Sequence, residues 1–300
     1  MKFFIYLAFI LLLFCNGLFG QYNSVLAEGN WYKITTNKAG IYKLSYSSIN
    51  ALGIDVSDLK ISDLKLYGNG GGMLPHLNSE LRHDDLVENA IKIHDANNNG
   101  IFDSDDYMLF YGQSPHVWNF DASTQLFKHE SHLFSNEVNY FLVVDSQTVG
   151  KRIQEKNTVQ NATKTITSFN AFLFHESELE NLIQSGKEWF GERFDVQNNR
   201  SFDFNFPNLI SSSPVSIKTA VVARSLVPSV FTIKANGSTI QTINVPNIVT
   251  TYATEYAKTA SETVDYNASS SNININITYS SSDMEPYLCL IILKLMQDDH

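Results

Sequence analysis

The residues with the clearest chemical potential lie in an oxygen-rich segment from residue 95 to residue 106. Counted from its start, oxygen donors take the ligand positions of an EF-hand calcium loop: Asp95, Asn97, Asn99, the Ile101 carbonyl, Asp103 and Asp106. Gly100 takes the position where such loops turn sharply. The spacing therefore predicts a structural Ca²⁺ site. Asp106 replaces the usual Glu, which puts bidentate coordination by this residue in question.

Two short apolar segments border this loop and must position it. Residues 90–94 precede the loop and residues 107–111 follow it, and both have the length and composition of β-strands. A strand–loop–strand unit has no pair of helices to open, so a calcium ion here would stabilise the fold and would not act as a switch. The alternative is a turn without metal, because Asn and Asp favour turns in any case.

Other residue groups give weaker signals for chemistry. His129 and His132 are one residue too close to place two zinc ligands on one helix face, and His175 has no histidine near it in the sequence. Cys289 lies in an apolar run, where a thiol is usually inert. The glycine run at 68–72 lacks the Lys-Ser/Thr pair of a phosphate-binding loop, so it predicts a turn with closely packed backbone.

Residues 1–20 have the features of a signal peptide. Lys2 gives a positive start, residues 3–14 form an apolar run, and Gly20 ends a candidate cleavage site. The run is too short to span a bilayer comfortably. Cys15 raises lipid attachment as an alternative, but the bulky Phe14 before it argues against this. The sequence predicts an exported chain without a transmembrane helix after signal cleavage.

The composition fits an exported β-rich protein. The formal net charge is -10, and aromatic residues make up 12% of the chain. An acidic chain without basic clusters argues against binding to nucleic acid or to an anionic membrane surface. Signal cleavage would leave Cys289 as the one cysteine, so no internal disulfide is expected and stability must come from size or from calcium.

Residues 21–153 are predicted to form an N-terminal β domain that contains the calcium-like loop. Strands are expected ahead of the loop at residues 31–34, 40–46 and 64–67. A single helical turn is expected from Ser47 to Leu52, where Gly53 ends it.

A second domain is predicted at residues 169–300, after a polar linker at 154–168. A short helix is expected at 176–183, and strands follow. Phe202, Phe204 and Phe206 share one face of a strand, and Asp203 lies on the other. Asn236-Gly237 predicts a two-residue hairpin turn.

The predicted fold class is therefore all-β, with one or two short helices. It consists of the N-terminal β domain followed by an antiparallel β-sandwich or jelly roll, because short strands recur at the spacing typical of such folds.

Several phrases of this sequence resemble one known family. They lie at residues 31–34, 40–44, 66–75, 85–89, 110–116 and 189–192. Together they resemble the N-terminal region of the PorU family, the gingipain-related sortases of the type IX secretion system. The resemblance extends over most of residues 24–282.

The resemblance implies a role in cargo processing. The family removes C-terminal sorting domains from secreted cargo and joins the cargo to a lipopolysaccharide anchor. Its cysteine nucleophile and histidine lie in a caspase-like domain downstream of every residue present here. No residue of this chain is therefore assigned a catalytic role, and the chain alone is expected to be inactive.

The same resemblance implies partners and a location. Other type IX secretion components and secreted cargo proteins are the expected partners. The expected location is the cell surface, the outer membrane or the periplasm. The alternative from another class is a secreted, calcium-stabilised adhesion or carbohydrate-binding module, which an aromatic-rich β surface would also suit.

The last residues depart from the family pattern. From about residue 284 the alternation of apolar and polar residues gives way to an apolar run. At this place the sequences of the family resemble Leu-Asp-Tyr-Ile-Glu-Ile-Asn, an amphipathic closing strand. DNA encoding Asp-Tyr-Ile-Glu-Ile-Asn-Ala-Arg-Arg, read one nucleotide late, can encode residues 291–299, so we expect a truncation or frameshift here. The last strand would then leave an apolar exposed edge on the sandwich. The alternative is a genuine apolar last strand.

Overall fold

The computed structural model describes residues 24–123, 126–158, 160–184, 188–251, 254–281 and 286–297. The chain divides into two compact units, residues 1–158 and 159–300. Strands dominate both units, which confirms the predicted all-β class. The predicted signal peptide lies outside the described residues. Within the described ranges, no helix is long and apolar enough to cross a membrane.

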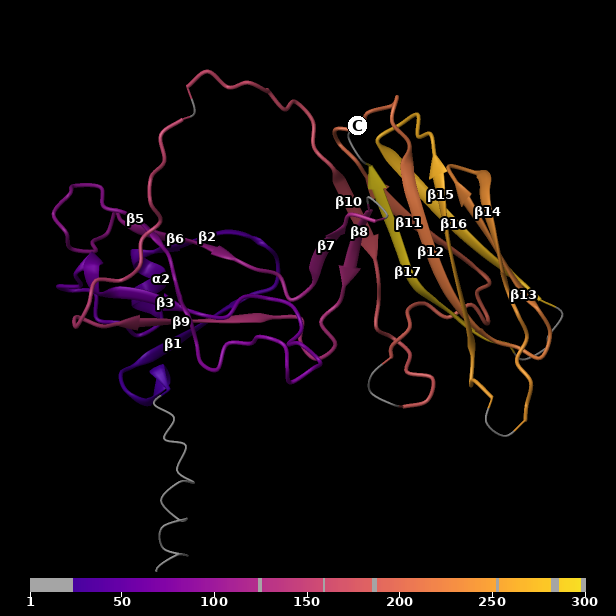
Figure 1. Ribbon diagram of the computed structural model, residues 1–300, viewed down its shortest axis with the longest axis horizontal. Helices are drawn as coiled ribbons and strands as arrows, with labels where there is room; N and C mark the ends of the chain where they lie inside the picture. Colours follow the sequence, from indigo (N-terminus) through magenta and orange to yellow (C-terminus); the bar gives the residue numbers. More distant parts are fainter. Residues whose placement is uncertain are drawn as a thin grey trace, which may run out of the picture. The chain divides into compact units, whose positions relative to one another are not determined.

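Among the described residues of the first unit, nine strands form two antiparallel sheets and a hairpin. They are β1 (Trp31–Thr36), β2 (Gly40–Ser45), β3 (Leu64–Tyr67), β4 (Glu88–Asn89), β5 (Lys92–His94), β6 (Tyr107–Gly112), β7 (Val117–Asp121), β8 (Leu126–Glu130) and β9 (Val138–Val144). One sheet has the order β1-β9-β3-β4, and the other has the order β2-β6-β5. β7 pairs with β8 (Figure 1). The strands expected at 31–34, 40–46 and 64–67 are all present.

Helical structure is confined to short pieces of the first unit in the described part of the chain. They are α2 (Tyr46–Ala51) and two 3₁₀ turns, η1 (Val25–Ala27) and η2 (Ile61–Asp63). The Ser45 hydroxyl caps α2 by accepting a hydrogen bond of 3.2 Å from the Ser48 N–H. Gly53 follows at a φ of +93°, a conformation that glycine adopts without strain. The predicted helical turn is therefore confirmed, with its start moved by one residue.

The prediction of a helix at residues 176–183 is wrong, because this segment is not helical. The N–H groups of Leu179 and Glu180 donate to the Phe190 carbonyl at 2.9 and 2.8 Å, and the Phe190 N–H donates back to Glu180 at 2.8 Å. Because these backbone groups bond to Phe190, they cannot make the hydrogen bonds of a helix between residues four apart. Local composition could not show this pairing.

The core of the first unit forms between its sheets and α2. Ile49 of α2, Leu66 of β3, Phe110 of β6 and Tyr140 of β9 are almost completely buried together. The Phe110 ring stacks on Tyr42 with centroids 5.5 Å apart. Burial of each large apolar side chain contributes about 1.5–3 kcal/mol to folding, so these contacts hold the sheets in place.

In the second unit, the residues that the structure describes form a sandwich of two four-stranded antiparallel sheets. Its strands are β10 (Ala171–His175), β11 (Asn199–Asn205), β12 (Val215–Arg224), β13 (Ser229–Ala235), β14 (Ser238–Val245), β15 (Lys258–Tyr266), β16 (Asn272–Ser280) and β17 (Tyr287–Gln297). One sheet has the order β10-β17-β12-β15 and the other has the order β11-β16-β13-β14 (Figure 1). The predicted hairpin turn joins β13 to β14, with Asn236 and Gly237 at φ +46° and +86°.

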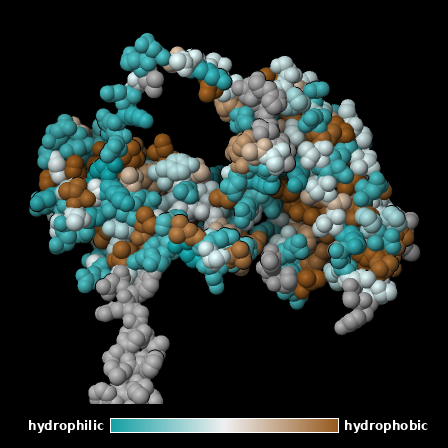
Figure 2. Space-filling view, viewed as in Figure 1, coloured by the Kyte–Doolittle hydropathy of each residue, from teal (hydrophilic) through white to brown (hydrophobic). Residues whose placement is uncertain are grey.

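Alternating residues of both sheets fill the sandwich core. Phe204 and Phe206 are buried with Phe231 and Ile275, while Phe202 is half-buried against the same cluster. Asp203 is exposed, as its opposite parity predicts. The predicted face assignment of this strand is therefore confirmed. On the side shown in Figure 2, hydrophobic side chains are scattered among hydrophilic ones on both units.

The predicted exposed edge at the last strand is wrong. β17 lies inside its sheet, where it pairs with β10 on one side and β12 on the other. Leu288 and Leu293 enter the core, and Cys289 on the opposite face is covered by Phe190. An apolar strand with both faces covered is stable in this position. The frameshift itself stays a prediction.

Candidate functional site

The calcium-like loop connects two paired strands. His94 of β5 pairs with Tyr107 of β6, and Ile93 pairs with Met108. The His94 and Tyr107 rings stack with centroids 4.6 Å apart, directly at the base of the loop. The predicted strand–loop–strand arrangement is confirmed.

Two carboxylates close the loop from its ends. Asp106 accepts hydrogen bonds from the Ala96 N–H at 2.8 Å and the Asp103 N–H at 3.0 Å. Asp95 accepts from the Asn99 N–H at 3.2 Å and the Gly100 N–H at 2.9 Å. Although its side chain is shorter than that of Glu, Asp106 at the twelfth loop position thus reaches the second position. Asp106 is only 2% exposed.

The middle of the loop brings the remaining predicted side chains together. The Asp103 carboxylate accepts hydrogen bonds from the side-chain amides of Asn97 at 2.8 Å and Asn99 at 3.1 Å. The Asn97 and Asn99 side-chain oxygens accept backbone N–H groups of Asn99 and Ile101. Side chains from positions three, five and nine therefore converge.

The loop is fastened to the core on its far side. Phe102 is completely buried, and its N–H donates to the Leu59 carbonyl at 2.7 Å. The Gly100 carbonyl accepts from the Ile61 N–H at 3.1 Å. Its φ of +79° favours glycine, and no other atom lies near the place of an added Cβ. Residues outside the loop thus hold its turn in place.

The donor set has the chemistry that Ca²⁺ prefers. Carboxylate, amide and carbonyl oxygens are hard ligands, and the three Asp residues supply the negative charge. The structure does not gather three or more His, Cys, Asp or Glu groups into a metal-binding cluster in the part of the chain that it describes. A bound ion would therefore have to replace the hydrogen bonds that the Asn97 and Asn99 amides donate to Asp103.

The glycine run packs tightly against a neighbouring segment. A Cβ on Gly71 would lie 1.9 Å from the Ser114 carbonyl oxygen, and one on Gly70 would lie 2.6 Å from the Gln113 side chain. The Gly71 N–H donates to Gln113 Oε1 at 2.8 Å. Close backbone packing, which the sequence predicted, explains these glycines.

Cys289 and the histidine pair do not form a catalytic arrangement. Cys289 is fully buried, and burial raises the pKa of its thiol to about 12. The thiol is therefore protonated at neutral pH and a poor nucleophile. His129 lies in β8 beside Trp118, with ring centroids 4.8 Å apart. His132 follows that strand, and its Nδ1 accepts backbone N–H groups.

The structure brings together a serine, a histidine and a glutamate that the sequence analysis did not connect. His175 Nε2 lies 2.8 Å from Glu192 Oε1 and 3.4 Å from Ser177 Oγ, and the Ser177 hydroxyl donates to Glu192 at 3.3 Å. Burial disfavours the Glu192 carboxylate, yet hydrogen bonds from His175 and Ser177 keep its pKa below the usual range.

This group does not have the geometry of a catalytic triad. A triad uses the two ring nitrogens of histidine for different partners, whereas Nε2 of His175 faces both Ser177 and Glu192. The three side chains instead fasten the segment around Glu192 to β10. No sequence signal could have found them, because their contact depends on how the segment folds back.

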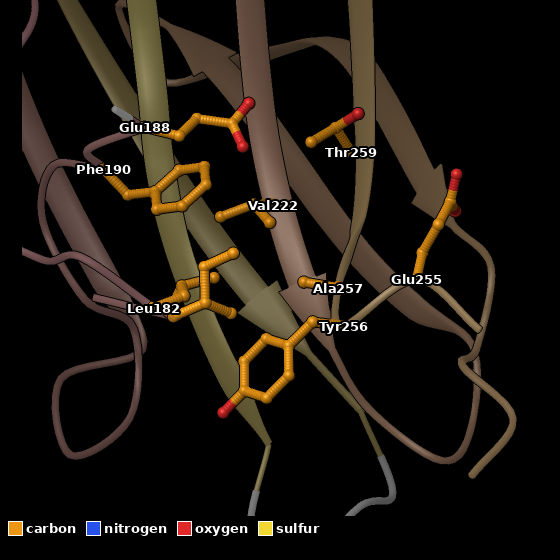
Figure 3. Close-up of a pocket in the computed structure, with 9 residues that line it drawn as sticks. Leu182, Glu188, Phe190, Val222, Glu255, Tyr256, Ala257 and Thr259 are labelled. Carbon is orange, nitrogen blue, oxygen red and sulfur yellow. The ribbon is translucent and has the colours of Figure 1, made fainter. Parts of the chain in front are cut away.

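Cavities open on the second unit among the residues that the structure describes. One of about 280 Å³ lies over β12 and β15, with Glu188, Phe190 and Val222 at one end and Tyr256 at the other, near Leu182 (Figure 3). Two others, of about 390 and 460 Å³, lie between β10 and β11 and share the lining residues Leu173 and Asn205.

Comparison with known proteins identifies a shared fold. No family model matches the sequence, and no curated protein is similar enough to be counted as a relative. The chain is similar to a solved structure of dimeric latent PorU from Porphyromonas gingivalis, with a TM-score of 0.72 and 22% identity. The match covers 92% of this chain and 25% of that one, so the chain spans about a quarter of the PorU chain. The resemblance to PorU is thereby confirmed at the level of the fold.

Two carbohydrate-binding modules are also similar over smaller regions. A CBM36 module in complex with calcium and xylotriose has a TM-score of 0.25, and a CBM36-1 domain of a xylanase from the hindgut metagenome of Trinervitermes trinervoides has one of 0.29. They cover 34% and 42% of this chain, at 12% identity, and 77% and 95% of their own. These TM-scores are too low to support an argument.

Proposed function

We propose that this chain is a non-catalytic region of a PorU-like sortase of the type IX secretion system. The observation that carries the proposal is the PorU fold over 92% of the chain. The phrases of sequence that resemble the family lie in both units, at the β1–β2 and glycine-run segments and again at residues 189–192.

The chemistry of the described residues favours a non-catalytic role for this chain. The family's mechanism needs an ionisable cysteine beside a histidine, whereas Cys289 is buried with a raised pKa. The partners would be secreted cargo and other secretion components, and the location would be the cell surface, outer membrane or periplasm. Calcium at residues 95–106 would stiffen the first unit without taking part in chemistry.

A domain exchange tests this role. In a bacterium with a type IX system, the part of its PorU that matches this chain is replaced by this chain. We expect the hybrid to process cargo and release sorting domains, as measured by the size of cargo on immunoblots. The matched control carries the same exchange with Phe204→Ala, which weakens the core of the sandwich. A hybrid that is stable, reaches the cell surface and processes no cargo would contradict the proposal.

A second experiment tests the non-catalytic assignment directly. The purified chain should show no peptidase or transpeptidase activity on cargo with an intact sorting domain. Cleavage by the wild-type chain that is lost in Cys289→Ala would contradict it.

Glycan binding is the second candidate function, and one cavity favours it. The cavity of about 460 Å³ carries the 68% exposed ring of Phe169 beside the amides of Asn205 and Asn208. An exposed aromatic ring with neighbouring amides suits the apolar face and hydroxyls of a sugar. Binding to a glycan array that Phe169→Ala abolishes would support this alternative, and an empty array would reject it.

A further inference from the structure

The sandwich of the second unit is closed along one side and open along the other except where the His175 ring of β10 lies 4.5 Å from the Phe202 ring of β11, measured between centroids. β14 and β15 lie against each other at the closed side. At the open side, β10 and β11 are the outermost strands of the two sheets, each with one strand neighbour among the described residues. The two cavities that share Leu173 and Asn205 form a groove between them.

The outward backbone groups of β11 can be assigned from its pairing with β16. The Tyr279 N–H donates to the Asn198 carbonyl and the Phe206 N–H to the Ser271 carbonyl, both at 2.8 Å. Bonded and non-bonded pairs alternate in an antiparallel ladder, so the even-numbered residues of β11 bond to β16. The odd-numbered residues therefore turn their N–H and C=O groups to the open side: Asn199, Ser201, Asp203 and Asn205.

Neither proline nor a bulge interrupts β11. Its two charged residues are Asp203 on the exposed face and Arg200 on the core side, where the Arg200 guanidinium donates to the Arg193 carbonyl at 2.8 Å. Its outward residues are all exposed. Leu173 and Phe204 line the groove beside it, so apolar surface lies next to unpaired backbone.

We propose that β11 accepts an extended segment of a partner polypeptide as an additional strand. Backbone hydrogen bonds to the odd-numbered residues would supply affinity, and alternate apolar side chains would enter the groove. The strand that already pairs with the other edge of β11, β16, shows which side chains suit a neighbour of this strand. There Asn274 donates to Asp203 at 2.7 Å and Asn276 donates to Ser201 at 2.9 Å, while the isoleucines of β16 enter the core.

The partner segment is therefore about five to seven residues long, with amide or hydroxyl side chains alternating with branched apolar ones. An acidic residue opposite Asp203 would be repelled, so an amide or a basic residue belongs there. The proposal does not depend on the sortase role, because it rests on the edge alone.

A blocked peptide with the sequence of residues 272–278 is a suitable probe, because this sequence already pairs with β11 at its other edge. We expect saturable binding to the wild-type chain by fluorescence anisotropy, with a Kd of about 10⁻⁴ to 10⁻³ M for a single short strand. A scrambled peptide without alternation should bind at least about tenfold more weakly.

Ser201→Pro is the decisive variant. Proline removes the outward N–H of residue 201 and leaves the backbone hydrogen bonds to β16 intact. It also removes the hydroxyl that accepts from Asn276 of β16, and Ser201→Ala controls for that loss. It should weaken binding at least about tenfold, whereas Ser201→Ala, which keeps the N–H, should bind within about twofold of wild type. Melting curves verify that both variants fold. Should the proline variant not fold, the fully N-methylated peptide gives the same comparison on the wild-type chain, and its expected result is loss of binding.

Three results would overturn the proposal. The first is no rise in the anisotropy of the probe with up to about 1 mM wild-type chain, where the expected Kd would leave at least about half of the probe bound. The second is equal binding by the wild type and Ser201→Pro. The third is a dimer in sedimentation velocity that Ser201→Pro dissociates, because the edge would then be filled by a second copy of this chain.

Discussion

The loop at 95–106 and the outer face of β11 and β16 use the same residue types in different ways. Both are rich in Asn, Asp and Ser. In the loop, Asp95 and Asp106 turn inward and accept backbone N–H groups of the loop itself. On the sheet, Asn274 and Asn276 donate to side chains of the neighbouring strand.

The difference follows from backbone geometry. Irregular backbone exposes N–H groups that nearby carboxylates can accept, and the converging oxygens suit a cation. In a strand, the backbone N–H and C=O groups point sideways and bond to the neighbouring strands, so they are not available to side chains of the same strand. Alternate side chains point to the same flat face of the sheet. Polar composition alone therefore does not define a binding site.

The largest effect should come from the buried side of β11. Phe204→Ala should lower the free energy of unfolding by about 3–5 kcal/mol, because it leaves a cavity in the sandwich core. Asp203→Ala, on the exposed face, should change it by about 0.5 kcal/mol or less. Urea titration measures both, and similar losses for the two variants would refute the assigned faces.

Calcium should give the next largest effect, through the loop. With a Kd of about 10⁻⁴ to 10⁻³ M, calcium at about 10 mM should raise the free energy of unfolding by about 1.4–2.7 kcal/mol. Asp106→Asn should abolish this gain because it removes one of the three carboxylates. Melting curves in chelator and in calcium measure the gain.

The matched control is Asp105→Asn, which removes the same charge from a position that is not a ligand. This variant should keep most of the calcium response. Identical wild-type curves in chelator and in calcium would show that the loop is a turn without metal.

Substituting two glycines, one in the loop and one in the second unit, distinguishes the cost of backbone strain from the loss of metal binding. Gly100 and Gly237 both have positive φ, at +79° and +86°, and open space around an added Cβ. Alanine at either position should cost about 1 kcal/mol or somewhat more. Gly100→Ala alone should also weaken the calcium response, as measured by titration calorimetry. An equal loss of response in Gly237→Ala would contradict a local site.

The smallest effect should come from the amide ladder. Asn274→Ala removes the same hydrogen bond that Asp203→Ala removes, so it should likewise cost about 0.5 kcal/mol or less. Calcium should not change this cost. Denaturant titrations with and without calcium measure it, and a calcium-dependent cost would show that the two regions are coupled.

The sequence by itself determined the features that depend on neighbouring residues. The oxygen spacing from Asp95 to Asp106 set the loop, because each position lies within reach of the same turn. Asn236-Gly237 set the β13–β14 turn through its positive φ angles. The alternation of Phe202, Phe204 and Phe206 set the buried face of β11, because the side-chain period of a strand is two.

Only the tertiary structure decided which strands become neighbours. β17 has the composition of an apolar edge but lies between β10 and β12, more than a hundred residues away from β10 in sequence. A separate pairing, between Glu180 and Phe190, turned residues 176–183 from an expected helix into an irregular segment. The pairing of the strands also left β11 as the open edge. Hydrogen bonds between distant strands leave no periodic trace in either strand, so their partners emerge only when the chain packs.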